Sequence, residues 1–222
     1  MPGGIAFEFP QLYFTGLWVT IQISILGLLS ALFIGTVVAV MRVSPLAPLR
    51  WIGATYVEFF RNTPLVVQLF FLFLGLPLIG FRFSTDTFEH IFRAAFVGMG
   101  VYHGAYVAEV VRGGLLGVDR GQIEAARSLG LSYPQMLRYV QLPQTFRSVI
   151  PPLGNIGIAL VKNTSLASTI GVTELLFAAE IVESRTFRAE EAFIAATLLY
   201  LSLTIPLGIA VNTLERRMLV AR

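Results

Sequence analysis

The chain has 222 residues, of which 55% are hydrophobic and 13% charged, and its mean hydropathy is +0.75. A soluble domain carries about a quarter charged residues, so this composition predicts a polytopic helical membrane protein. Cysteine is absent, which excludes disulfides, thiolate metal sites and a cysteine nucleophile, and a net charge of +3 without any Lys/Arg-rich run argues against nucleic-acid binding.

Five membrane spans are predicted, at about residues 12–41, 54–80, 92–115, 147–182 and 192–214. The fourth segment is too long for one straight crossing and too short for two at ~1.5 Å per residue. We therefore predict one crossing that is bent at Pro151 and Pro152 and broken near 162–165. No internal repeat or long linker divides the chain, so residues 1–222 are expected to form a single all-α transmembrane domain, and the start lacks the basic n-region of a cleavable signal peptide.

The distribution of arginines predicts how these spans are oriented. With the N-terminus outside, ten arginines flank the cytoplasmic ends of the spans and four flank the outer ends. The ten are Arg42, Arg50, Arg112, Arg120, Arg127, Arg138, Arg147, Arg216, Arg217 and Arg222, and the four are Arg82, Arg93, Arg185 and Arg188. The C-terminus and residues 119–143 are therefore predicted to be cytoplasmic.

Residues 119–143 are predicted to form a short hairpin of two helices. Asp119 and Gln122 fit a capping box, and the helix that follows is expected to end at Gly130. Ser132 and Gln135 repeat the capping pattern, and we expect Pro143 to stop the second helix. The capping pattern alone fits a rigid docking knob and an ordinary helical loop equally well.

The spacing of residues in this hairpin resembles the EAA loop of ABC importer permeases. Glu124-Ala125-Ala126, Gly130 and Leu142-Pro143 match that pattern, with Val140 where the family has isoleucine or a similar aliphatic residue. Val57–Pro77, Val161–Leu176 and Ser184–Arg188 resemble polar amino acid permeases, although Asn62 stands where these often carry glycine. Over roughly Thr15–Arg217, the chain is similar to the transmembrane permease subunit of a polar amino acid ABC importer.

This resemblance implies a type I importer permease in a bacterial cytoplasmic (inner) membrane, acting as a dimer with an identical or similar chain. It implies a separate pair of ATPase subunits that bind ATP and magnesium, and an extracytoplasmic binding protein that delivers the substrate. The residues implied in ATPase coupling are Glu124, Ala125, Ala126, Arg127, Gly130, Leu142 and Pro143. The chain itself is not expected to be an enzyme or to hold a cofactor or metal, because its one lysine, Lys162, is followed by Asn163 in an apolar span and cannot belong to a P-loop.

Polar residues inside the spans are candidates for the transport pathway, because they are costly in a bilayer. The candidates are Glu58, Lys162, Asn163, Thr164, Ser165, Ser168, Glu174 and Glu180. Glu58 could instead neutralise Arg61 as a structural pair, as Glu109 could neutralise Arg112, and we favour this for both pairs.

Other polar and small residues have a structural alternative. Lys162 is assigned either to the pathway or to an ion pair between helices. Glu180 and Glu183 either meet a cationic substrate or the delivering protein, or, as we slightly favour, pair with Arg185 and Arg188. His103 is expected to be a packing residue, and nearby small residues predict a tight helix contact, namely Ala94, Ala95, Gly98, Gly100, Gly104 and Ala105.

An ion-gradient-driven secondary transporter or channel is the alternative function. Inverted repeats and an intramembrane network of acids would favour it, but the sequence has no repeat, and this alternative leaves the capped hairpin unexplained. An intramembrane enzyme lacks a candidate catalytic constellation, since there is no cysteine, no Gly-x-Ser-x-Gly motif, and the two histidines are far apart in sequence.

Overall fold

A computed structural model describes residues 4–220 of the chain, so Arg222 lies outside the described residues. All regular structure between these residues is helical. The elements are α1 (Ile5–Glu8), α2 (Pro10–Val43), α3 (Ala47–Asn62), α4 (Leu65–Phe70), the π-helical segment η1 (Phe71–Gly75), α5 (Leu76–Leu78), α6 (Thr87–Leu116), α7 (Arg120–Ser128), α8 (Tyr133–Met136), the π-helical segment η2 (Leu137–Gln141), α9 (Leu142–Asn163), the 3₁₀ helix η3 (Thr164–Ile170), α10 (Leu175–Thr186) and α11 (Ala189–Val220).

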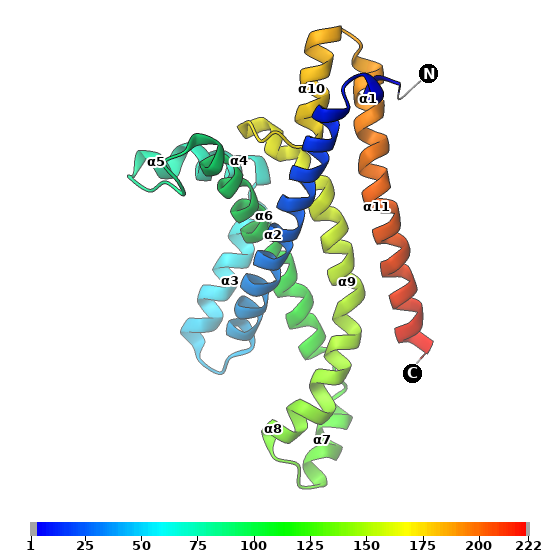
Figure 1. Cartoon of the computed structure of the whole chain (residues 1–222). Coiled ribbons are helices and arrows are strands. Elements are labelled where there is room, and N and C mark those ends of the chain that lie inside the picture. The colour runs from blue at the N-terminus through cyan, green and yellow to red at the C-terminus, as the bar shows by residue number, and fades with distance from the viewer. Residues whose placement is uncertain (1–3, 221–222) are drawn as a thin grey trace.

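The long helices confirm a polytopic membrane protein. In the described part of the chain, α2, α6 and α11 are each long and apolar enough to cross a membrane alone. Two bent pairs raise the number of spans to as many as five, and they are α3 with α4–α5, and the continuous segment from α8 to η3 with α10. In Figure 1 the α10–α11 turn and α1 lie at one end of the bundle, and the α7–α8 hairpin projects from the other end.

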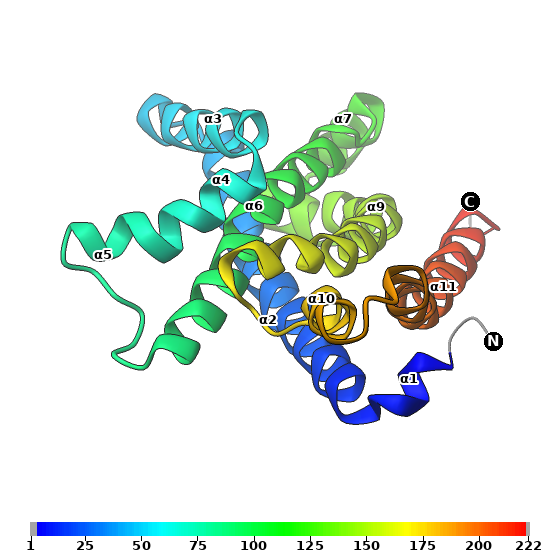
Figure 2. The ribbon, with the colours of Figure 1, turned by 90° about the horizontal axis from the view of Figure 1, so that it is seen from above.

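The core of the bundle is the contact between α2 and α6, which is made by small residues. A Cβ on Gly35 would lie 2.5 Å from Cβ of Val107, and a Cβ on Gly100 would lie 2.5 Å from Cβ of Ser30. The two backbones therefore approach more closely than larger side chains would allow. The sequence predicts that α6 carries a tight contact surface, and the structure identifies α2 as its partner. Figure 2 shows α2, α6 and α9 between the α3–α5 arm and α11.

The second predicted span, 54–80, is not one continuous helix. The chain turns by 106° between α3 and α4. Because Pro64 restricts the preceding residue, Thr63 takes an extended conformation (φ −108°, ψ 139°) and ends α3. The Gln68 amide then donates to the carbonyls of Phe60 and Thr63, at 3.0 and 3.2 Å, which the break frees from the helix ladder. The predicted span 54–80 therefore corresponds to a pair of helices with a break at this proline.

Pro143 does not stop the second helix of the hairpin, as we expected from sequence. It lies in the first turn of α9, directly after the π-helical segment η2. Proline cannot donate to the helix ladder and its ring crowds the carbonyl four residues earlier, and a wider π turn at that point accommodates both effects. Pro77 follows η1 at the same offset. There the unpaired Phe73 carbonyl accepts a hydrogen bond from Nε2 of buried His90 at 3.0 Å.

The fourth predicted span contains α9, η3 and α10. The α-helix ends at Asn163, and a 3₁₀ helix continues to Ile170. Gly171 then takes a left-handed conformation, with φ +89°, and the chain resumes as α10 at an angle of 49°. The regular helix thus ends at the Lys162–Ser165 segment, within the membrane-spanning part of the chain.

Candidate functional site

The first helix of the hairpin, α7, is closed at both ends by specific hydrogen bonds. The Asp119 carboxylate accepts from the amide of Gly121 at 2.7 Å and caps the N-terminus. At the other end, Gly130 has φ +79°, and its amide and that of Leu131 donate to the carbonyls of Arg127 and Ala126, at 2.9 and 3.2 Å. This is the Schellman arrangement, which fixes the turn between α7 and α8.

The capping box predicted at Asp119 and Gln122 does not form. Asp119 already caps α7, and Oε1 of Gln122 accepts a hydrogen bond from the Gln144 amide of α9 instead. The second box forms only in part: Oε1 of Gln135 accepts from the Ser132 amide at 2.9 Å, but the Ser132 hydroxyl donates to the same oxygen at 2.8 Å.

The hairpin presents a mixed polar and apolar surface at its tip. Glu124, Ala125, Arg127 and Gly130 are exposed. Ala126 is 4% exposed and packs inside the hairpin, so any part it has in the predicted coupling is through support of its exposed neighbours.

Sequence reasoning missed two apolar residues on the same hairpin. Leu129 is 82% exposed and Tyr139 is 64% exposed. An apolar residue in a short helix is assigned to the core by default, and only the structure reveals that these two face outward. Exposed apolar groups on a segment that projects from the bundle mark an interaction surface.

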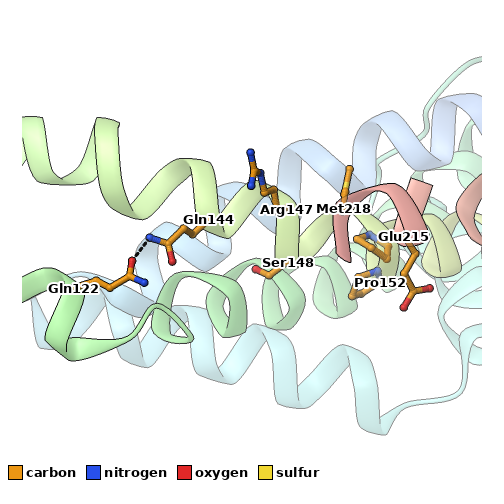
Figure 3. A pocket seen from close by; sticks show the side chains of 8 residues that line it. Gln122, Gln144, Arg147, Ser148, Pro152, Glu215 and Met218 are labelled. Atoms are coloured by element: carbon orange, nitrogen blue, oxygen red, sulfur yellow. Dashed lines mark hydrogen bonds between the residues drawn. The ribbon is translucent and has the colours of Figure 1, made fainter. Parts of the chain in front are cut away.

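The base of the hairpin is attached to two membrane helices. The Gln141 amide donates to the Leu115 carbonyl at 3.1 Å, and the Thr145 hydroxyl donates to the Gly114 carbonyl at 3.2 Å. The Gln144–Gln122 bond joins α9 to α7 (Figure 3). Leu142 and Pro143 begin α9 at this junction. An open cavity of about 470 Å³ lies beside it, lined by Gln122, Gln144, Arg147, Ser148, Pro151, Pro152, Glu215 and Met218.

A continuous chain of polar contacts runs from α3 across α6 to the end of α9. The Arg61 guanidinium lies 5.2 Å from the centre of the Tyr106 ring. The hydroxyls of Tyr106 and Tyr102 are 3.0 Å apart, and the Tyr102 ring meets the His103 ring edge-on at 5.1 Å. The Asn163 amide then donates to Nε2 of His103 at 3.1 Å. His103 therefore connects α6 to the broken span rather than only packing between helices.

These residues and their exposed neighbours form what we call the polar face. A cavity of about 250 Å³ opens at its α3 end. The tyrosines were missed from sequence, although their i,i+4 spacing in an apolar span could have identified them. The polar face consists of Arg61, Tyr106, Tyr102, His103 and Asn163, with Glu58 and Asn62 beside Arg61 at the cavity and exposed Lys162 next to Asn163 in the chain.

Two predicted side-chain pairs have different outcomes. Arg61 lies over Tyr106 and, among the described residues, makes no ion pair with exposed Glu58, so that predicted pair does not form. Glu109 does pair with Arg112, at 2.8 Å, and it also contacts Arg42 of α2. In a single copy of the chain Lys162 is exposed, and it forms no ion pair with any other residue in the range 4–220.

Three other pathway candidates are buried away from the polar face. Thr164, Ser168 and Glu174 are 0%, 8% and 0% exposed. Glu174 caps α10, since one carboxylate oxygen accepts from the Phe177 amide at 2.9 Å and the other accepts from the Tyr200 hydroxyl. Ser165 donates to the Lys162 carbonyl at 2.8 Å.

The pairing that we slightly favoured for Glu180 and Glu183 is not the one that forms. Arg188 instead bonds to Glu191, with Nε 2.8 Å from the carboxylate, and to Glu8 of α1 at 2.9 and 3.1 Å. Glu180 is exposed on α10. Between residues 4 and 220, no group of three His, Cys, Asp or Glu side chains is placed to hold a metal ion.

Comparison with known proteins agrees with this architecture. Residues 31–220 match the model of the binding-protein-dependent transport system inner membrane component family. The chain is 40% identical over 214 residues to the probable glutamine ABC transporter permease protein GlnM of Bacillus subtilis, covering 96% of each chain. It is 37% identical to the glutamine transport system permease protein GlnP of Escherichia coli, covering 91% of each chain.

Solved structures show the same fold. A chain of an amino acid ABC transporter crystallised with histidines superposes with a TM-score of 0.89 at 32% identity, covering 98% of this chain and 99% of that one. A chain of the inward-facing MetNI methionine ABC transporter superposes with a TM-score of 0.71 at 21% identity, which supports the fold alone. The chain therefore belongs to the binding-protein-dependent transport system inner membrane component family, and it is a membrane permease subunit without catalytic activity of its own.

Proposed function

We propose that this chain is the permease of an ATP-driven importer of polar amino acids, with glutamine as the first substrate to test. The substrate class rests on the names of the relatives, among which glutamine and glutamate permeases recur. The observation that carries the coupling is the α7–α8 hairpin, whose exposed tip is hydrogen-bonded at its base to α6 and α9.

The hairpin tip is the proposed contact with a separate ATPase subunit, which binds ATP and magnesium. Glu124 and Arg127 supply charge, Leu129 supplies apolar area, and Gly130 allows close approach. Because Gln122, Gln141 and Thr145 connect this tip to two membrane helices, a displacement of the tip is passed to them as a rigid-body motion. Closure of an ATPase pair on ATP thus moves the spans on either side of the polar face.

The polar face is the proposed wall of the transport pathway. It exposes acidic, basic and hydrogen-bonding side chains within the spans, which is costly if the face meets lipid. A second copy, or a similar permease, covers it and encloses a polar route between the two chains. Lys162 and Arg61 would then meet the carboxylate of an amino acid, and Glu58 its ammonium group. Thr164, Ser168 and Glu174, which are buried away from this face, are assigned to the packing of the broken span rather than to the wall.

The N-terminus is proposed to lie outside the inner membrane and the C-terminus in the cytoplasm. Arginine distribution supports this orientation, and it puts α7–α8 on the ATPase side and the α10–α11 turn on the side of a binding protein.

The test is uptake by the assembled transporter. The chain, its ATPase and its binding protein are reconstituted in liposomes, and glutamine uptake is measured with and without internal ATP. We expect uptake only with ATP. The Glu124→Lys variant should insert normally but lose uptake and ATPase association, because it reverses a charge at the contact.

The matched control is Glu215→Lys, which reverses an exposed charge at the same end of the bundle outside the hairpin. It should retain association with the ATPase. Uptake by the permease alone, driven by a sodium or proton gradient, would contradict the proposal and favour a secondary transporter.

A further inference from the structure

The turn between α10 and α11 holds an aromatic residue in an uncommon backbone conformation. Phe187 has φ +57° and ψ +23°, the left-handed region, and it is the one non-glycine residue with positive φ between residues 4 and 220. Its amide closes α10 by donating to the Glu183 carbonyl at 2.7 Å. Glycine or asparagine usually occupies such a position, because a bulky side chain crowds the backbone there. The phenyl ring therefore does not serve the turn itself.

The phenyl ring also contributes little to the packing of the bundle. It is 87% exposed, which puts it among the most exposed large apolar side chains of the described residues. It takes part in none of the ring–ring contacts found among residues 4–220. A side chain that is unfavourable for the turn and absent from the core is available for a partner.

The next residue, Arg188, holds this turn rigidly. Its guanidinium bonds to Glu191 at the start of α11 and to both carboxylate oxygens of Glu8 in α1. These bonds raise the pKa of Arg188 above its usual range, because the carboxylates stabilise its charged form. The Thr186 hydroxyl accepts from the Arg188 amide at 3.3 Å. The ring is thus presented on a braced turn, which lowers the entropy lost when a partner binds.

The surroundings of the ring distinguish a protein partner from lipid. Five charged residues lie within four positions of Phe187, which places the turn outside the hydrocarbon. They are Glu183, Arg185, Arg188, Glu190 and Glu191. In Figure 1 the turn lies at the end of the bundle opposite the α7–α8 hairpin. An aromatic anchor within a charged rim is the usual composition of an interface hot spot.

We propose that the α10–α11 turn, residues 186–188, is a docking point for the extracytoplasmic binding protein, with Phe187 inserted into an apolar hollow on its surface. This inference rests on the proposed function, and the family's dependence on a binding protein supplies the partner. Arg185 and Glu190, both exposed beside the ring, form the charged rim of the contact.

The test compares Phe187→Gly with the unaltered chain in the complete transporter, in nanodiscs, by titrating substrate-loaded binding protein and measuring ATPase activity. Phe187→Gly removes the ring and fits the left-handed backbone, so the melting temperature should stay equal or rise. We expect the binding-protein concentration for half-maximal stimulation to rise on the order of tenfold, as for loss of an interface aromatic, with unchanged basal ATPase activity. Phe88→Ala, which removes a 75% exposed phenylalanine from the first turn of α6, should leave this concentration unchanged.

Each outcome decides the inference. Equal half-maximal concentrations for Phe187→Gly and the unaltered chain would overturn it. A lower melting temperature or membrane yield with unchanged stimulation would also overturn it and assign the ring to the membrane interface. If the unaltered transporter is not stimulated at all, the proposed function fails rather than this assignment.

Discussion

Polar side chains in the spans of this permease fall into two kinds, according to what occupies their hydrogen-bonding atoms. The hydrogen-bonding atoms of the Glu174 and His90 side chains are occupied by neighbouring groups. Glu174 caps α10 and accepts from Tyr200, and His90 bonds the Phe73 carbonyl and the Phe83 amide. The side chains of Glu58 and Lys162 remain exposed. The first kind stabilises the bundle, and the second is available to a substrate or a second chain.

Replacing Glu174 should lower stability rather than remove a substrate contact. Glu174→Ala removes the acceptor of the Tyr200 hydroxyl proton and of the Phe177 amide at a buried site, which should cost about 3 kcal/mol of unfolding free energy. The measurement is the thermal unfolding midpoint in detergent. Glu180→Gln, on the exposed side of the same helix, should change stability by less than about 0.5 kcal/mol. If Glu174→Gln kept full stability and lost only uptake, Glu174 would belong to the pathway.

The sequence could not separate these two kinds of residue. The rule that charge inside a span is functional selects both Glu174 and Glu58. It does not reveal that Glu174 is already hydrogen-bonded, because the partner comes from another helix. Tyr200 is 26 residues from Glu174. The EAA motif could be identified from the sequence, because its residues are close together along the chain. The burial of Ala126 could not be predicted, because it depends on how α7 packs against α8.

At the scale of elements, the membrane helices within residues 4–220 are broken at two places, of which the sequence predicts one. Uncharged runs predict where spans lie, and the Lys162–Ser165 region was predicted as a break because its polarity interrupts such a run. Pro143, which we expected to stop a helix, follows a π turn and lies within a continuing helix, whereas Pro64, for which we made no prediction, ends α3. A proline specifies a local restriction, and the surrounding turn decides whether the helix stops.

The junction between α7 and α9 should transmit force through the Gln122–Gln144 bond. Gln144→Leu removes the bond at similar volume, so we expect binding of the ATPase to persist while the amount of substrate moved per ATP falls several-fold. The measurement is uptake and ATP hydrolysis in the same liposomes. Ser128→Ala, which removes only a bond of α7 to its own Glu124 carbonyl, is the control and should keep the ratio unchanged. A normal ratio in Gln144→Leu would show that Gln141 and Thr145 suffice.

At the scale of the whole molecule, three surfaces are arranged along the bundle. The α7–α8 hairpin lies at one end and the α10–α11 turn at the other (Figure 1), and the polar face is formed by residues of α3, α6 and α9. A signal received at the turn must therefore cross the membrane to reach the hairpin, and α9 is the element that extends from the hairpin base to the broken span. The family resemblance predicts the role of the hairpin from its local sequence. The polar face could not be predicted in this way, because its residues come from three helices that meet only in the folded structure.

The proposed orientation can be tested directly, because the chain contains no cysteine. Single serine-to-cysteine changes introduce one thiol each, at Ser128 in α7 and at Ser184 near the end of α10, both exposed. A membrane-impermeant maleimide applied to intact cells should label Ser184→Cys and leave Ser128→Cys unlabelled, and permeabilised cells should label both. Reversed labelling would place the hairpin outside, where ATP is absent, so the coupling mechanism would fail together with the assignment of Phe187. Labelling of both thiols in intact cells would show that the two turns share one side, which an odd number of spans between them forbids.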